Sequence, residues 1–207
     1  MVIPESQSRF SQGWSEADYV GGHPVLDFIN TVADTGKTRL GDKIGSWEAL
    51  RDWVGGAGLL SKQELAAFLQ DPELDDDGAL ARLHDLREQA YEGMLGLVGL
   101  ADTARQSMAY QGMEHVEEAI REALGRGAFR EEGGRFRWRP DAGSSERWLD
   151  AVALGLEDFL RSEDVARLRQ CARCTWLFVD RGRGAGRRWC DMRTCGNRAK
   201  AEAFRCR

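Results

Sequence analysis

The chain has 207 residues, of which 42% are hydrophobic and 30% are charged, and its mean hydropathy is -0.50. This composition suits a soluble protein with a buried core, and the apolar runs are far shorter than the roughly 18 residues that span a bilayer. Met1 to Glu5 show no basic start followed by an apolar stretch. We therefore expect no signal peptide, no membrane partner and a cytoplasmic location.

The net charge of -5 hides an asymmetry between two parts of the chain. Residues 1–170 carry 19 Lys and Arg against 31 Asp and Glu, a net charge of -12, whereas residues 171–207 carry 10 against 3, a net charge of +7. A basic C-terminal segment predicts an anionic partner. The alternative is that this segment docks onto the acidic part of the same chain.

Hydrophobic spacing predicts about six helices between residues 20 and 170. Apolar residues recur at helical intervals in residues 23–32, 46–54, 61–69, 79–103, 107–124 and 145–160. A further short helix is expected to begin at Ser162 and to lead into Cys171. We interpret the aromatic and Met side chains of residues 20–170 as core.

Helix-capping residues and one change of period support these assignments. Ser46 can cap its helix, Ser61 with Glu64 forms a capping box, and either Ser144 or Ser145 can cap the helix that follows. Between residues 128 and 140 the apolar side chains alternate on both sides of a Gly-Gly turn. That alternation predicts a single β-hairpin.

Five cysteines lie in the last 37 residues: Cys171, Cys174, Cys190, Cys195 and Cys206. Clustered cysteines in a chain of cytosolic type favour metal over disulfides. The first four have the spacing Cys-x2-Cys, fifteen residues, Cys-x4-Cys, and four thiolates are a preferred ligand set for Zn²⁺. An iron–sulfur cluster fits this spacing less well. The sequence predicts one structural Zn²⁺ per chain, with Cys206 as a free thiol.

The fifteen residues between the cysteine pairs are expected to form a hairpin. Residues 176–179 would go out and residues 187–189 would return. Gly196 is expected to take the left-handed backbone that a tight knuckle can need, and a short helix would run from Asn197 to about Phe204. A segment with so few aliphatic residues cannot fold by burial of apolar surface alone. We therefore expect zinc binding to contribute about 10 kcal/mol or more to its stability.

This region resembles the CGNR zinc finger, named for the tetrapeptide Cys195-Gly196-Asn197-Arg198. Residues 189–192 (WCDM) and 171–174 (CARC) fit the same pattern, and residues 26–31 (LDFINT) are similar to the opening motif of the ABATE-type domain that precedes this finger. The resemblance covers nearly the whole chain. It implies a stress-induced bacterial transcription regulator.

We therefore predict a mainly α fold with two parts. Residues 20–170 would form a helical ABATE-like domain with one β-hairpin. Residues 171–207 would form a small treble-clef- or ribbon-like zinc module of the CGNR type. The expected function is DNA binding through the basic module, with the helical domain sensing a ligand or mediating assembly.

Polar residues around the hairpin tip and the second knuckle form the candidate nucleic-acid surface: Arg181, Arg183, Arg187, Arg188, Arg193, Asn197, Arg198 and Lys200. Arginines can neutralise phosphates or read guanine, and Asn197 could read adenine. Asn197 and Arg198 could equally be structural, as helix caps or partners of cysteine sulfurs. Asp180 is expected to orient an arginine of the returning strand. Because one finger presents little surface, specific binding would need a homodimer or a larger complex.

Four polar residues at the first helix form a candidate ligand site: His23, Asp27, Asn30 and Thr31. The alternative is that the Asn and Thr side chains satisfy buried backbone groups. No catalytic triad order or metal-binding His motif is present in the sequence, so we expect no enzyme. Two other functions stay open: a protein-interaction scaffold with purely structural zinc, or a small-molecule-binding helical domain.

Overall fold

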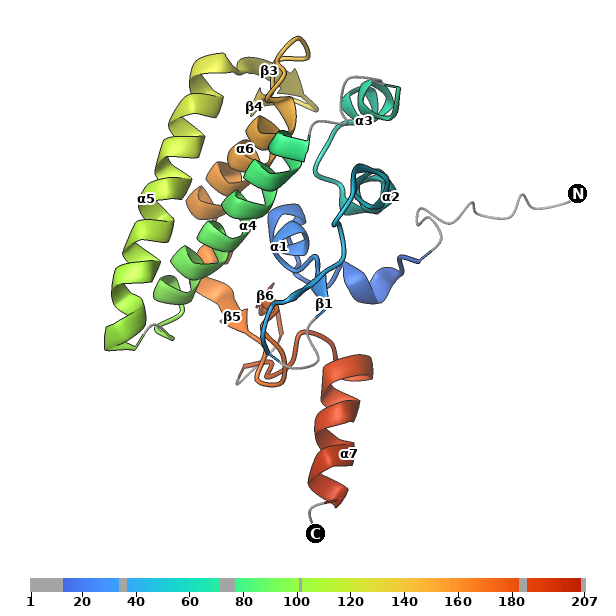
Figure 1. The fold of residues 1–207 in the computed structure, drawn as a ribbon, viewed down its shortest axis with the longest axis vertical. Helices are drawn as coiled ribbons and strands as arrows, with labels where there is room; N and C mark the ends of the chain where they lie inside the picture. The colour runs from blue at the N-terminus through green and yellow to red at the C-terminus, as the bar shows by residue number, and fades with distance from the viewer. Residues whose placement is uncertain (1–12, 34–36, 71–76, 101, 183–185, 206–207) are drawn as a thin grey trace, which may run out of the picture.

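The computed structural model describes residues 13–33, 37–70, 77–100, 102–182 and 186–205 (Figure 1). Within these ranges the N-terminal part contains six α-helices, as the hydrophobic spacing predicts. They are α1 (Pro24–Ile29), α2 (Trp47–Ala57), α3 (Lys62–Leu69), α4 (Asp77–Leu97), α5 (Thr103–Arg126) and α6 (Arg147–Arg161). None of the helices described is long and apolar enough to cross a membrane.

Three long helices, α4, α5 and α6, pack side by side, and the short α1 lies against α4 and α6 (Figure 1). Val25, Phe28 and Ile29 of α1 are completely buried there. Burying each such side chain contributes about 1.5–3 kcal/mol. Helix α2 contacts α1 and α3, and Phe68 of α3 packs against Trp148 of α6.

Helices α4 and α5 approach each other closely because glycines face each other at their contact. A Cβ atom on Gly112 of α5 would lie 2.9 Å from the backbone nitrogen of Gly93 in α4. Any larger residue at position 112 would therefore force the two helices apart.

Two of the predicted helix caps are confirmed. Ser46 accepts a hydrogen bond from the Ala49 backbone amide, and Ser61 and Glu64 form the reciprocal capping box. The cap of α6 was predicted wrongly, because Glu146 occupies the N-cap position. The Ser144 hydroxyl instead accepts from the Glu146 amide, one step before the helix begins.

The break between α4 and α5 lies earlier than predicted. The chain leaves α4 after Leu97, and Gly99 takes a φ of +68°, which ends a helix at low cost in glycine. Asp102 then accepts from the Arg105 amide at 2.9 Å and caps α5. Local capping thus determines this boundary, although the apolar spacing continues through it.

The predicted hairpin is confirmed as β3 (Ala128–Glu132) paired with β4 (Arg135–Arg139) through Gly133 and Gly134. The interpretation of its aromatic side chains as core is wrong. Phe129 and Phe136 are 55% and 64% exposed, and Trp138 is 37% exposed. Their rings pack mainly on one another, with Phe129 centred 5.4 Å from Phe136 and 5.2 Å from Trp138. Alternation predicts a strand but does not determine which of its faces is covered.

Two further strand pairs were not predicted. Val32–Ala33 (β1) pairs with Gly41–Asp42 (β2), and Leu168–Gln170 (β5) pairs with Leu177–Val179 (β6). Ser162 begins a short 3-10 helix, Glu163–Arg167, which leads into β5.

Strand β6 lies between two clusters of buried residues. Successive side chains of a strand point to opposite faces. Leu177 and Val179 therefore join the core of the helical part, while Phe178 packs against the cysteines. The hydrophobic core is continuous across residue 170, and the division into residues 20–170 and 171–207 stays a prediction.

Candidate metal centre and nucleic-acid surface

The first cysteine knuckle is the turn between β5 and β6. Cys171 and Cys174 lie in this turn, and the Cys171 amide donates to the Trp176 carbonyl at 2.9 Å. The predicted pairing of residues 176–179 with residues 187–189 is therefore wrong. The edges of β6 are used elsewhere, because β5 pairs with it and the Val179 amide donates to Gly21 O at 2.8 Å.

The second knuckle carries Cys190 and Cys195. Asp191 caps a π-helical turn, Met192–Gly196, from which α7 (Asn197–Arg205) continues. The prediction for α7 is confirmed, but that for Gly196 is wrong, since Gly196 is not among the residues with positive φ. A Cβ atom at Gly196 would lie 2.5 Å from the sulfur of Met192, so a larger residue there would displace this flexible side chain.

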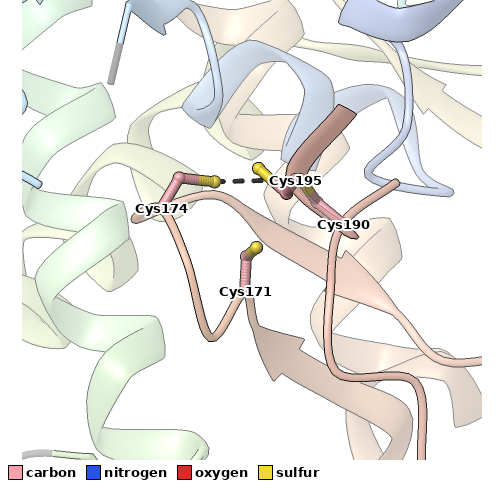
Figure 2. A group of neighbouring side chains, drawn as sticks. All are labelled: Cys171, Cys174, Cys190 and Cys195. Atoms are coloured by element: carbon pink, nitrogen blue, oxygen red, sulfur yellow. Dashed lines mark hydrogen bonds between the residues drawn. The ribbon is translucent and has the colours of Figure 1, made fainter. Parts of the chain in front are cut away.

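The four knuckle cysteines converge on one point (Figure 2). Their sulfur atoms all lie within 4.8 Å of one another, and those of Cys174 and Cys190 are 3.7 Å apart. A tetrahedral Zn²⁺ with bonds of about 2.3 Å to sulfur requires sulfur separations of about 3.8 Å. All four side chains are buried. The residues therefore fit one structural zinc ion, with no ligand position left open.

The thiols also need a cation to ionise together. Hydrogen bonds from Cys174 and Cys190 hold the pKa of the Cys171 thiol far below its usual value. The same contact with Cys171 raises the pKa of Cys174 and of Cys190. One thiolate thus suppresses the others, and a bound divalent cation is what would let all four carry charge.

Arg187 holds the second knuckle to the rest of the protein. Its guanidinium donates to the carbonyls of Trp189 at 2.9 Å, of Val20 at 3.3 Å and of Cys190, and it lies 4.3 Å from the centre of the Phe178 ring. This side chain was predicted to contact nucleic acid. Its Nε and Nη2 atoms are used within the protein, so we leave this exposed side chain out of the proposed binding surface.

Two other polar residues of the predicted hairpin, Asp180 and Arg181, also bond within the protein. Asp180 accepts hydrogen bonds from the backbone amides of Gly182 and Arg187. It therefore orders the backbone of the loop, whereas it was predicted to orient the guanidinium of an arginine. These bonds hold the pKa of Asp180 below its usual value. Arg181 pairs with Asp164 of the helical part. Arg183 lies outside the described residues.

The remaining candidates lie on the exposed side of the module. Arg188, Arg193, Arg198 and Lys200 are all exposed. Asn197 donates to the Arg193 carbonyl at 3.1 Å, which favours the structural interpretation of that side chain. Arg188 lies over the Trp189 ring at 5.2 Å.

Three basic residues near this surface were missed by the sequence analysis. Arg205 is exposed at the end of α7, seven residues after Arg198 and thus on the same helix face, a spacing that could have revealed it. Lys37 donates to the Ala172 carbonyl at 3.1 Å, and Arg173 pairs with Glu202. Lys37 and Arg173, with Arg188, Trp189 and Lys200, line a hollow of about 590 Å³ beside α7. No local signal links Lys37 to a knuckle 135 residues away.

Asn30 joins the helical part to the zinc module. Its side-chain amide donates to Leu177 O at 2.8 Å and accepts from Leu177 N at 2.9 Å. Trp176 adds a bond from its ring nitrogen to Val32 O at 3.0 Å. These contacts align β6 with the end of α1.

The other three candidate ligand residues also make internal hydrogen bonds. Asp27 accepts from the Gly21 amide at 2.8 Å, and the Thr31 hydroxyl donates to Phe28 O at 2.7 Å. His23 accepts from Val25 N and so caps α1, and burial lowers its pKa. His23 also lines a cleft of about 630 Å³ beside the β3–β4 hairpin. Ligand binding by these residues stays a prediction.

Two family models match the chain. Residues 22–163 match ABATE, described as "Putative stress-induced transcription regulator", and residues 167–207 match the CGNR zinc finger. A comparison with curated proteins finds no match.

Fold, cysteine cluster and matched segments together define a zinc-finger protein with a helical N-terminal part. Because the ABATE match covers more than half of the chain, the protein belongs to the ABATE family, with a CGNR zinc finger at its C-terminal end. At the level of that family description it is a transcription regulator.

Proposed function

We propose that the zinc module binds DNA through cations of α7 and the second knuckle, and that the helical part regulates this binding. The main observation behind this proposal is a group of basic side chains on one small module that are exposed and lie outside the core: Arg188, Arg193, Arg198, Lys200 and Arg205. Such a group supplies phosphate contacts.

The position of α7 supports this proposal. Among the described elements its main contact is with the π-helical turn of the second knuckle, and Figure 1 shows it extending away from the body. Arg198 and Arg205 lie on one face of α7, and an α-helix fits the major groove of DNA. Zinc would hold the start of this helix in place through Cys195.

The alternative of docking onto the acidic part of the chain receives little support. Among the described residues, one ion pair, Arg181–Asp164, links a cation of the module to an acid of the helical part. The surface of β6 that meets the helical part is apolar, with Leu177 and Val179 in the shared core. The exposed cations thus remain open to an external anion.

The test is binding of the zinc-loaded full chain to a labelled random DNA duplex as salt is raised. The variant Arg198→Gln/Lys200→Gln removes two proposed phosphate contacts. Since each contact contributes about 0.9 to the slope of log affinity against log salt, we expect a slope shallower by about 1.8. A single-stranded RNA competitor distinguishes RNA from DNA.

The matched control is Arg130→Gln/Arg135→Gln on the β3–β4 hairpin, which removes two exposed cations of the helical part. It should keep the wild-type slope. An equal loss in both variants would mean that net charge alone acts. No binding at low salt by protein holding one zinc per chain would overturn the proposal.

A further inference from the structure

A cavity of about 480 Å³ lies where the helical part meets the first cysteine knuckle. Helix α4 contributes Tyr91 and Glu92 to its wall, and the start of α5 contributes Arg105. Gln170 and Thr175, which directly flank the segment from Cys171 to Cys174, complete it on the side of the module. The cavity therefore touches both parts of the protein.

Arg39 brings an unused donor to this cavity. Its side chain is only 9% exposed and lies over the Tyr91 ring, with its guanidinium carbon 3.8 Å from the ring centre. Two of its nitrogens donate to Glu88 and one of these also to Ile29 O, but Nη1 is buried without a partner among the described residues. A buried donor without a partner costs stability, because it has lost water and gained nothing.

Glu92 brings an unused acceptor to the same wall. Its Oε2 atom is buried and also has no hydrogen-bond partner among the described residues. Glu92 and Arg39 both adjoin Tyr91, whose hydroxyl accepts from Gln170 at 2.7 Å. Two residues of the cavity wall, Arg39 and Glu92, thus each carry one buried polar atom without a partner among the described residues, a cationic donor and an anionic acceptor.

A ligand that carries an anionic acceptor and a cationic donor would satisfy both atoms with charge-assisted hydrogen bonds, which are stronger than neutral ones. Three further cations line the cavity: Lys37, Arg87 and Arg105. Arg87 is paired with Asp42 and Glu88, while Lys37 and Arg105 favour the anionic end of such a molecule. The combination of a carboxylate and an ammonium group on one small molecule matches this arrangement.

We propose that this cavity binds a small zwitterion of the α-amino-acid class, with its carboxylate at Arg39 and its ammonium group at Glu92. The inference deepens the regulatory half of the proposed function, since an occupant would contact residues on both sides of the first knuckle. The binding itself needs no DNA, and the experiment therefore separates the two.

The experiment follows thermal unfolding of the zinc-loaded full chain, without DNA, in the presence of single L-α-amino acids at millimolar concentration. Histidine and cysteine are left out because they chelate zinc. A ligand that binds the native state raises Tm in a saturable way. We expect at least one amino acid to do so, while acetate and methylamine, which each carry one of the two charges, have no effect at the same concentration.

The variant Glu92→Gln removes the proposed partner of the ammonium group. We expect its affinity for the amino acid to fall at least tenfold, with a basal Tm no lower than that of the wild type, because the affected oxygen has no hydrogen-bond partner to lose among the described residues. Glu48→Gln, an equal charge change on the exposed side of α2, is the control and should bind normally.

Two results would overturn the inference: no amino acid raises Tm, or Glu92→Gln binds as tightly as the wild type. Amino-acid binding by a protein that does not bind DNA would instead overturn the proposed function and leave this site intact. DNA binding without amino-acid binding would do the reverse.

Discussion

The helical part and the zinc module are stabilised in different ways. In the helical part, side chains such as Phe28, Leu86 and Phe159 are buried within one large apolar core. The second buried cluster consists of four cysteines and Phe178, with Trp176 and Trp189 partly buried at its edge. The apolar surface buried in this second cluster is too small to offset the entropy lost when the chain becomes ordered. Metal–thiolate bonds must therefore offset it.

The difference shows how a metal site can rely on a neighbouring core. One face of β6 belongs to the helical part and the other to the cysteine cluster, and Asn30 fixes the position of β6 through both of its backbone groups at Leu177. The module therefore does not need to be stable without the helical part. Conversely, loss of zinc should disturb the module first.

The largest effect is expected from breaking the metal centre. Cys174→Ser removes one thiolate from a set of four, and structural zinc contributes about 10 kcal/mol or more to such modules. We expect loss of the single zinc ion and fast amide hydrogen exchange in residues 171–205, while the helical part keeps its helical circular dichroism. Zinc analysis with hydrogen-exchange mass spectrometry measures both.

Cys206→Ser is the control for this experiment. It changes the fifth cysteine, which lies outside the described residues, and should keep one zinc per chain. If Cys174→Ser also retained a full equivalent of zinc, the four-cysteine assignment would fail.

A smaller effect is expected from separating the two parts at Asn30. Asn30→Ala leaves the Leu177 amide and carbonyl without partners in a buried position, at about 1–3 kcal/mol for each group. We expect a loss of about 2–6 kcal/mol in the free energy of unfolding, measured with urea. Asn197→Ala, which removes one exposed hydrogen bond, should cost far less. Equal losses in the two variants would mean that Asn30 does not join the two parts.

Local patterns in the sequence predicted much of this arrangement. Helical spacing located six helices, and cysteine spacing identified the metal centre, because both depend on residues close together in the chain. Pairing of β6 with residues 168–170 was missed, since the run from Trp176 to Val179 carries no mark of its partner. The position of β6 depends on the core of the helical part and on Asn30, which is 147 residues away from Leu177 in the chain.

The candidate nucleic-acid surface likewise could be predicted only in part from the sequence. Counting charges identified the module as basic, but the sequence could not distinguish Arg187, whose guanidinium bonds three backbone carbonyls, from Arg188 beside it, although both side chains are exposed. Those carbonyls come together only when the knuckle folds against Val20. The role of each arginine is therefore a property of tertiary structure.

We expect the stability of the protein to depend on pH through two carboxylates of the helical part, Glu88 and Asp42. Burial would raise the pKa of Glu88, but hydrogen bonds and charge from Arg39 and Arg87 outweigh it and hold that pKa below its usual value. Asp42 is shifted the same way, because bonds from Arg87 outweigh its burial. Groups with a lowered folded-state pKa stabilise the protein above their ordinary pKa, about 4, and lose that effect as pH falls.

We therefore expect the free energy of unfolding to fall as the pH is lowered from about 5 to 3, and to fall less in Glu88→Gln. Acid also releases zinc by protonating thiolates, but it does so in both proteins, so the difference between them isolates Glu88. Urea titrations at several pH values provide the measurement. If the free energy of unfolding fell equally with pH in the two proteins, Glu88 would contribute nothing to the pH dependence.

The smallest effect on stability is expected at the exposed hairpin, far from the zinc module in Figure 1. Phe136 is 64% exposed, so Phe136→Ser should change the free energy of unfolding by no more than about 0.5 kcal/mol. We propose that this aromatic face contacts a second copy of the chain, because one finger presents little surface and regulators commonly bind DNA as dimers. Sedimentation velocity of Phe136→Ser should then show weaker self-association. Phe204→Ser removes a ring from α7 that is even more exposed, at 81%. If that variant alone dissociates, the contact between the two copies lies on the zinc module and not on the hairpin.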